Sequence, residues 1–120
     1  MKKILIVENN EKNMMLMKDI LVFQKYEVIE AKNGEEGVKK AREEKPDLIL
    51  MDIQMPLMDG VTAAKILKND PATRGIKIIC VTSYAMKGDR ELVLEAGFDD
   101  YITKPIDTRA LPEIVKKQIG

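Results

Sequence analysis

The chain contains no histidine and only one cysteine, Cys80, among its 120 residues. Without histidine it cannot build a Ser-His or Cys-His catalytic pair, an imidazole metal site or a phosphohistidine of its own. A single cysteine cannot form an intrachain disulfide, and because Cys80 lies inside an apolar run we expect a buried, unreactive thiol. These absences exclude the commonest forms of nucleophilic catalysis.

The chain also lacks an excess of charge of either sign, with 20 Lys and Arg residues against 20 Asp and Glu residues. A balanced charge gives no reason to expect nucleic-acid binding. The first residues are strand-like, so we expect no leader sequence, and no apolar stretch of the sequence approaches the ~20 residues that span a bilayer. We therefore expect one domain over residues 1–120 that is a cytoplasmic monomer and does not bind a membrane.

Five short runs rich in β-forming residues alternate with segments of helical length and periodicity. The predicted strands are 3–7, 27–31, 48–52, 77–82 and 100–102, and the predicted helices are 11–24, 35–44, 61–69, 89–96 and 108–119. Continuous apolar strands separated by helices are typical of a parallel sheet that is buried on both faces. The pattern predicts an α/β fold with helices on both faces of the sheet.

Polar residues stand where the apolar runs end. Glu8, Asp52 and Thr82 each close a run, and Lys104 lies just past another. Parallel sheets hold ligands in the crevice outside the carboxyl ends of their strands. The sequence therefore predicts a pocket containing two acids, one lysine and one hydroxyl.

Such a pocket suits phosphoryl chemistry. A strand-end carboxylate beside a second acid can ligate a hard divalent cation or attack phosphorus. An ammonium group and a small hydroxyl can then stabilise the phosphoryl oxygens. The simpler alternative is a salt bridge between Lys104 and Asp52 that only satisfies polar strand ends.

Several motifs match one family in order and spacing. They are Lys3 to Glu8, Pro46 to Pro56, Met58-Asp59-Gly60, Val81-Thr82 and Lys104-Pro105. Through them the whole chain resembles the receiver domain of bacterial response regulators. The stretches Ala85 to Arg90 and Gly97 to Ile106 are most similar to the receivers of stand-alone cell-cycle regulators and of hybrid histidine kinases. The resemblance implies a flavodoxin-like sheet of five parallel strands in the order 2-1-3-4-5, with five helices.

The resemblance also implies a role for each site residue. Asp52 would accept a phosphoryl group from a histidine kinase or a histidine phosphotransfer protein, and Lys104 would bind it. Thr82 and Tyr101 would form a switch pair that changes the face built by the last two predicted helices and the strand between them, where a downstream protein effector binds. Gln54 and Tyr84 would flank the phosphoryl group. Such a domain is a switch that catalyses only its own phosphorylation and dephosphorylation.

One position departs from the family pattern. The family usually has two consecutive acids after the first strand, whereas this chain has Glu8-Asn9. The resemblance implies a Mg²⁺ site made by Glu8, Asn9, Asp52 and the carbonyl of Gln54. An amide in place of a carboxylate predicts weaker metal binding. The alternative is a pseudo-receiver that binds proteins without being phosphorylated.

Two other classes of protein share part of the pattern. A phosphatase of the haloacid-dehalogenase type needs a second Asp two residues after its nucleophile, where this chain has Gln54. A flavodoxin-like flavin carrier needs a phosphate loop rich in Ser, Thr and Gly after the first strand, where this chain has acidic residues. Both alternatives are therefore weaker than the receiver.

Overall fold

The computed structural model describes residues 1–55, 57–83, 91 and 93–120. The strands are β1 (Lys3–Val7), β2 (Glu27–Ala31), β3 (Leu48–Asp52), β4 (Lys77–Thr82) and β5 (Asp100–Thr103), and the helices are α1 (Glu11–Phe23), α2 (Gly34–Glu44), α3 (Gly60–Asn69) and α5 (Ala110–Ile119). Of the helix predicted at 89–96, the described residues 91 and 93–95 are helical and most of the others lie outside the described part.

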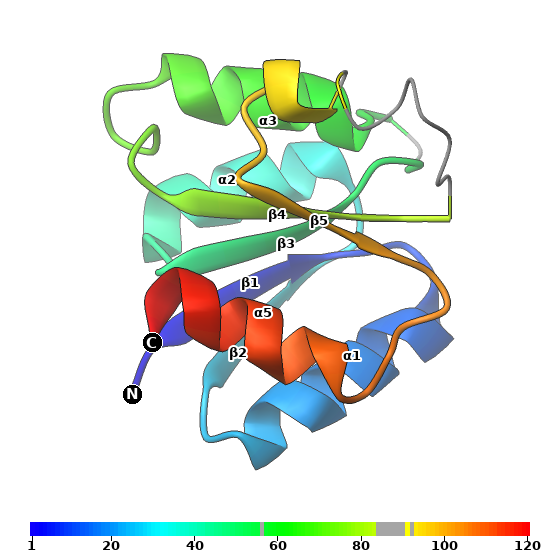
Figure 1. The fold of residues 1–120 in the computed structure, drawn as a ribbon. Helices are drawn as coiled ribbons and strands as arrows, with labels where there is room; N and C mark the ends of the chain where they lie inside the picture. Colours follow the sequence, from blue (N-terminus) through cyan, green and yellow to red (C-terminus); the bar gives the residue numbers. More distant parts are fainter. Residues whose placement is uncertain (56, 84–90, 92) are drawn as a thin grey trace.

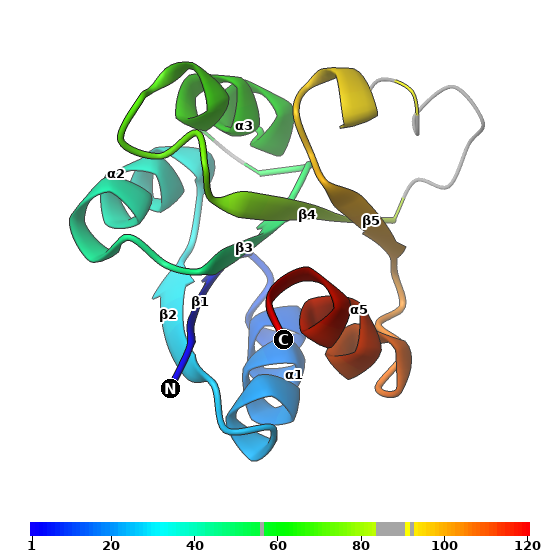
Figure 2. The ribbon, with the colours of Figure 1, turned by 60° about the vertical axis from the view of Figure 1, so that its left-hand side comes forward.

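The strands form one parallel sheet in the order β2-β1-β3-β4-β5. Helices α2 and α3 cover one face, and α1 and α5 cover the other (Figure 1). The view in Figure 2 shows the same two layers nearly end-on, with the twisted sheet between them. The predicted flavodoxin-like α/β fold is therefore confirmed.

The core lies on both sides of the three central strands. Because side chains alternate along a strand, each strand contributes to both layers. One layer contains Leu5, Val7, Ile49, Met51, Ile78 and Cys80, and the other contains Ile4, Ile6, Leu48, Leu50, Ile79 and Val81. This burial fixes the strand register, and the register determines which residues meet at the carboxyl edge.

Helix α1 is attached to this core by Met14, Met17 and Leu21, which are its buried residues. Its first turn is capped by Asn10, whose side-chain Oδ1 accepts a hydrogen bond from the Asn13 amide at 3.0 Å. In the described part of the chain, no helix has the length and apolar character needed to cross a membrane.

Gly60 allows α3 to begin directly against the end of β3. Its amide donates to the Ile53 carbonyl at 2.9 Å, and a Cβ added to it would lie 2.2 Å from the carbonyl oxygen of Asp52. No side chain fits there without moving the backbone that carries Asp52.

We therefore expect Gly60→Ala to lower the free energy of unfolding by about 2 to 3 kcal/mol, as overpacking does in a tight site. Gly75→Ala is the matched control, because a Cβ at Gly75 meets nothing within 4 Å. Its unfolding free energy should stay within about 0.5 kcal/mol of the wild type. Urea denaturation of both variants measures the difference, and equal midpoints would contradict this close approach.

Candidate functional site

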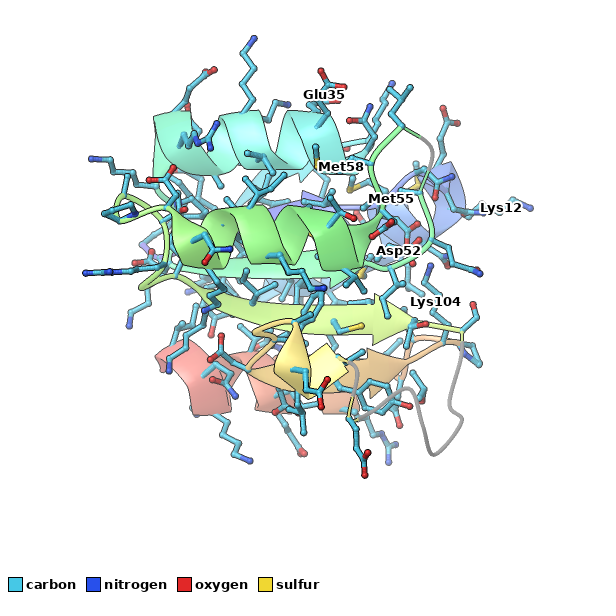
Figure 3. All side chains as sticks on the ribbon, turned by 90° about the horizontal axis from the view of Figure 1, so that it is seen from above. Lys12, Glu35, Asp52, Met55, Met58 and Lys104 are labelled. Atoms are coloured by element: carbon cyan, nitrogen blue, oxygen red, sulfur yellow. The ribbon has the colours of Figure 1, made fainter. Side chains whose placement is uncertain are left out.

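The parallel register brings the four predicted polar residues to one edge of the sheet. Asp52 ends β3 opposite Val81, and Thr82 ends β4 opposite Thr103. Glu8 follows β1, whose last residue pairs with Met51, and Lys104 follows β5. Figure 3 shows Asp52 and Lys104 at the same end of the molecule.

Lys104 pairs with both acids. Its Nζ lies 2.7 Å from Glu8 Oε1 and 3.2 Å from Asp52 Oδ2. Glu8 is 1% exposed and Asp52 is 5% exposed, so both carboxylates are almost fully removed from water. The Lys104 backbone is also held in place, because its amide donates to the Thr82 carbonyl at 2.7 Å. The site is thus a buried cluster of one cation and two anions.

Each carboxylate also has a backbone donor from its own loop. The Gln54 amide donates to Asp52 Oδ1, and the Asn10 amide donates to Glu8 Oε2, both at 3.2 Å. Glu8 Oε1 is different. It is buried, and its close ion pair with Lys104 lacks the geometry of a hydrogen bond, so it has no hydrogen-bond donor among the described residues.

The cluster shifts the pKa values of Glu8 and Lys104. Burial raises the pKa of Glu8, and the neighbouring Asp52 raises it further, although Lys104 and the Asn10 amide act in the opposite direction. Burial alone would lower the pKa of Lys104, but the two carboxylates outweigh it and the pKa is raised. Ionising Glu8 therefore costs free energy in the folded protein, whereas Lys104 stays protonated.

Cys80 is the buried, unreactive thiol that the sequence predicts. It is 0% exposed on β4. Burial, followed by the nearby Asp52 charge, raises its pKa to about 12. Almost no thiolate is present at neutral pH, so Cys80 takes no part in chemistry at the site.

The other predicted residues lie around this cluster. Asn9 and Gln54 are exposed in the loops after β1 and β3, Thr82 is buried, and Tyr101 is half-buried against the core layer below α2 and α3. Tyr84 lies outside the described residues. Sequence reasoning missed the contribution of the Asn10 amide, although the position of Asn10 just before an apolar helical stripe is a recognisable capping signal.

Comparison with known proteins agrees with this architecture. A family model described as the response regulator receiver domain matches residues 4–116. The chain belongs to this family.

Its relatives include a stand-alone cell-cycle regulator. The polar-differentiation response regulator DivK of Brucella anthropi is 45% identical over 119 residues, which cover 99% of this chain and 97% of DivK. A CheY-like receiver domain protein from Methanospirillum hungatei is 36% identical with a TM-score of 0.91, covering 99% of this chain and 94% of that one. The receiver domain of a sensor histidine kinase from Pseudomonas aeruginosa, solved with magnesium in its active-site cleft, is 34% identical with a TM-score of 0.92, covering 99% and 98%.

The donors present in this chain fit a hard divalent cation. Carboxylate, amide and carbonyl oxygens are the ligands that Mg²⁺ prefers. The buried Glu8 Oε1, which accepts no hydrogen bond from a described residue, belongs to a carboxyl group whose pKa is raised by burial and by Asp52 beside it. Nowhere in the described ranges do three His, Cys, Asp or Glu side chains gather as a metal-binding group. The site fits the ion with one carboxylate fewer than the usual family pattern.

Proposed function

We propose that this receiver domain is a phosphorylation-dependent signalling switch that accepts a phosphoryl group on Asp52. The observation that carries the proposal is the ion cluster itself, in which Lys104 lies 2.7 Å from Glu8 and 3.2 Å from Asp52 at the carboxyl edge of the sheet. The donor is the phosphohistidine of a histidine kinase or a histidine phosphotransfer protein. The chain acts only on itself, and we place it in the cytoplasm with such a donor.

In the transfer, a carboxylate oxygen of Asp52 attacks phosphorus as the bond to the histidine nitrogen breaks. The imidazole leaves with the electron pair of that bond, and a phosphorus–oxygen bond forms on Asp52. Lys104 already contacts Asp52 Oδ2, so its ammonium is placed to pair with a phosphoryl oxygen. The Gln54 amide holds the other oxygen, Asp52 Oδ1, and so orients the carboxylate for attack.

Mg²⁺ would be held by Glu8, Asp52, Asn9 and the carbonyl of Gln54. When bound, it supplies positive charge that stabilises the transferring phosphoryl group. The residues themselves exclude water from most of the site, because Glu8 and Asp52 are nearly fully buried.

We propose that the signal passes from the phosphoryl group to the effector-binding surface through Thr82 and Tyr101. Thr82 would hydrogen-bond the phosphoryl group, and Tyr101 would turn inward as Thr82 moves. That shift would change the face made by the helical segment before β5, β5 itself and α5, where a protein effector binds. The half-buried position of Tyr101 at the edge of the core supports this role.

We expect Thr82→Ala to be phosphorylated without the structural change in β5 and α5, because it lacks the hydroxyl that would hydrogen-bond the phosphoryl group. Amide chemical shifts with and without a phosphate mimic should then change near Asp52 but not in β5 and α5. Thr103→Ala is the control, because Thr103 pairs with Thr82 across β4 and β5 but is exposed. Remote shifts of wild-type size in Thr82→Ala would remove Thr82 from the switch.

The pseudo-receiver is the second candidate, since Asn9 stands where the family has an acid. Titration with beryllofluoride, which imitates a phosphoryl group on Asp, separates the two. A receiver should show magnesium-dependent amide shifts at Thr82 and Tyr101, and it should bind no flavin. The absence of any shift at saturating magnesium would favour the pseudo-receiver.

A further inference from the structure

The loop between β3 and α3 carries backbone groups that serve the site. The Gln54 amide donates to Asp52 Oδ1 at 3.2 Å, and the Gln54 carbonyl belongs to the proposed Mg²⁺ site. Both groups are parts of the main chain, so their positions depend on the path of the loop and not on the choice of a side chain. The contacts that fix this path therefore also fix how Asp52 is oriented.

Two glycines hold the loop. Gly60 closes its base, because its amide donates to the Ile53 carbonyl at 2.9 Å. Gly34, the first residue of α2, holds its far side, because its amide donates to the Met58 carbonyl at 3.2 Å. An α-helix leaves its first amides without partners inside the helix, so the Gly34 amide is available for this contact. The start of α2, which is distant from Asp52 in the sequence, thus contacts the loop that serves the site.

The contact between Gly34 and Met58 leaves no room for a side chain. A Cβ added to Gly34 would lie 2.4 Å from the Met58 carbonyl oxygen and 3.0 Å from its carbonyl carbon. The Met58 side chain is packed against the core layer below α2 and α3, which limits how far this residue can move. Figure 3 shows Met58 and Asp52 at the same end of the molecule as Glu35, the second residue of α2. A methyl group at position 34 would therefore press on a loop that is held on its other side.

Leu57, next to Met58, has a backbone conformation that requires such restraint. Its φ of 69° is in the left-handed region, which is unfavourable for a residue with a Cβ. Its side chain is 82% exposed, so the packing of that side chain contributes little to holding the conformation. Strained backbone persists where the surrounding structure leaves it no alternative. The hydrogen bonds that Gly34 and Gly60 donate to the loop supply this restraint.

We propose that Gly34 is a positioning residue for phosphoryl transfer, which acts through Met58 to hold the loop in the path that places the Gln54 backbone. The inference rests on the proposed function and adds to it a residue from a different helix. Glycine is needed at this position because only a residue without a Cβ allows the start of α2 to approach the loop so closely. A glycine with a purely structural role would affect the stability of the fold and not the chemistry of the folded protein.

Gly34→Ala tests this role, because its methyl group would displace the Met58 carbonyl. Gly37→Ala is the matched control. Gly37 is a buried glycine of the same helix, and a Cβ there would lie 2.8 Å from the Val7 side chain, against the core and not against the loop. Both variants should lose stability, so they are assayed at a temperature at which circular dichroism shows each of them fully folded.

Phosphorylation by acetyl phosphate should be followed by intact mass at a series of magnesium concentrations. We expect Gly34→Ala to be phosphorylated about tenfold more slowly than the wild type at saturating magnesium, because small misplacements of reacting groups have large effects on rate. It should also need severalfold more magnesium to reach half of its maximal rate, because the Gln54 carbonyl is displaced. Gly37→Ala should match the wild type in both quantities.

A slower rate and a higher magnesium requirement in Gly34→Ala alone would support the inference. Wild-type kinetics in folded Gly34→Ala, or equal changes in both variants, would overturn it and leave the proposed function intact. If the wild type itself takes up no phosphoryl group, the proposed function fails and this inference fails with it.

Asn33→Ala decides the question if Gly34→Ala does not fold. Asn33 is the N-cap of α2, and its Oδ1 accepts a hydrogen bond from the Glu36 amide at 2.8 Å. Removing this cap loosens the first turn of the helix, which carries Gly34, without adding an atom to the contact. The magnesium requirement of Asn33→Ala should rise above that of the wild type, and an unchanged requirement would overturn the inference.

Discussion

Asp52→Asn should take up no phosphoryl group from acetyl phosphate and magnesium, whereas the wild type should gain the mass of one. An amide nitrogen cannot replace the carboxylate oxygen as the nucleophile. Glu8, the other carboxylate paired with Lys104, is still more deeply buried, at 1% exposed against 5% for Asp52. The variant should still fold, because Asn keeps one oxygen that can accept a hydrogen bond from the Gln54 amide or from Lys104, which are the donors to Asp52 among the described residues.

Asp59→Asn is the control for this experiment. It removes a carboxylate from the loop that follows Asp52, and Asn can keep the capping bond that Asp59 Oδ1 accepts from the Thr62 amide at 2.8 Å. Intact-mass spectra should show wild-type phosphorylation for this control. Phosphoryl uptake by Asp52→Asn at the wild-type rate would show that the acceptor lies elsewhere.

Lys104→Met should lower the free energy of unfolding by about 3 kcal/mol at neutral pH. The change leaves two buried carboxylates facing each other without a counter-charge, and breaking a buried pair from one side costs this much. Lys12→Met is the control, because Lys12 is exposed at the same end of the molecule (Figure 3) and should cost less than about 1 kcal/mol.

The pH dependence of the Lys104→Met variant gives a second test. The folded-state pKa of Glu8 is already raised above its ordinary value of 4.5, so ionising Glu8 costs stability as the pH rises through that window. Without Lys104 this pKa should rise further and the cost should grow. The stability deficit of the variant should therefore shrink as the pH falls toward 4.5, in urea unfolding at several pH values. A deficit that does not change with pH would mean that Lys104 stabilises the fold through packing and not through charge.

The sequence alone predicted the fold because its signals were local and consistent. Buried strands appear as continuous apolar runs, and the parallel order aligns their polar end residues, so Glu8, Asp52, Thr82 and Lys104 were expected at one edge. Small errors arose where side-chain contacts set an element's end. The last helix begins at Ala110 and not at Thr108, because the Asp107 carboxylate accepts the amides of Arg109 and Ala110 in the preceding turn.

The internal geometry of the site could not be read from the sequence. The sequence suggested a salt bridge between Lys104 and Asp52, but Lys104 lies closer to Glu8, at 2.7 Å against 3.2 Å. That preference depends on side-chain packing at the ends of strands that are distant in the chain. The raised pKa of Glu8 likewise follows from its burial, which no local pattern reports.

Chemical localisation of the phosphoryl group tests the central claim most directly. The protein should be treated with acetyl phosphate and magnesium, reduced with borohydride, which converts an aspartyl phosphate to homoserine, and digested for peptide mass spectrometry. We predict homoserine at position 52 only when both the phosphodonor and magnesium are present. Homoserine at another position, or none anywhere in the chain under these conditions, would contradict the assignment of Asp52 as the phosphoryl acceptor.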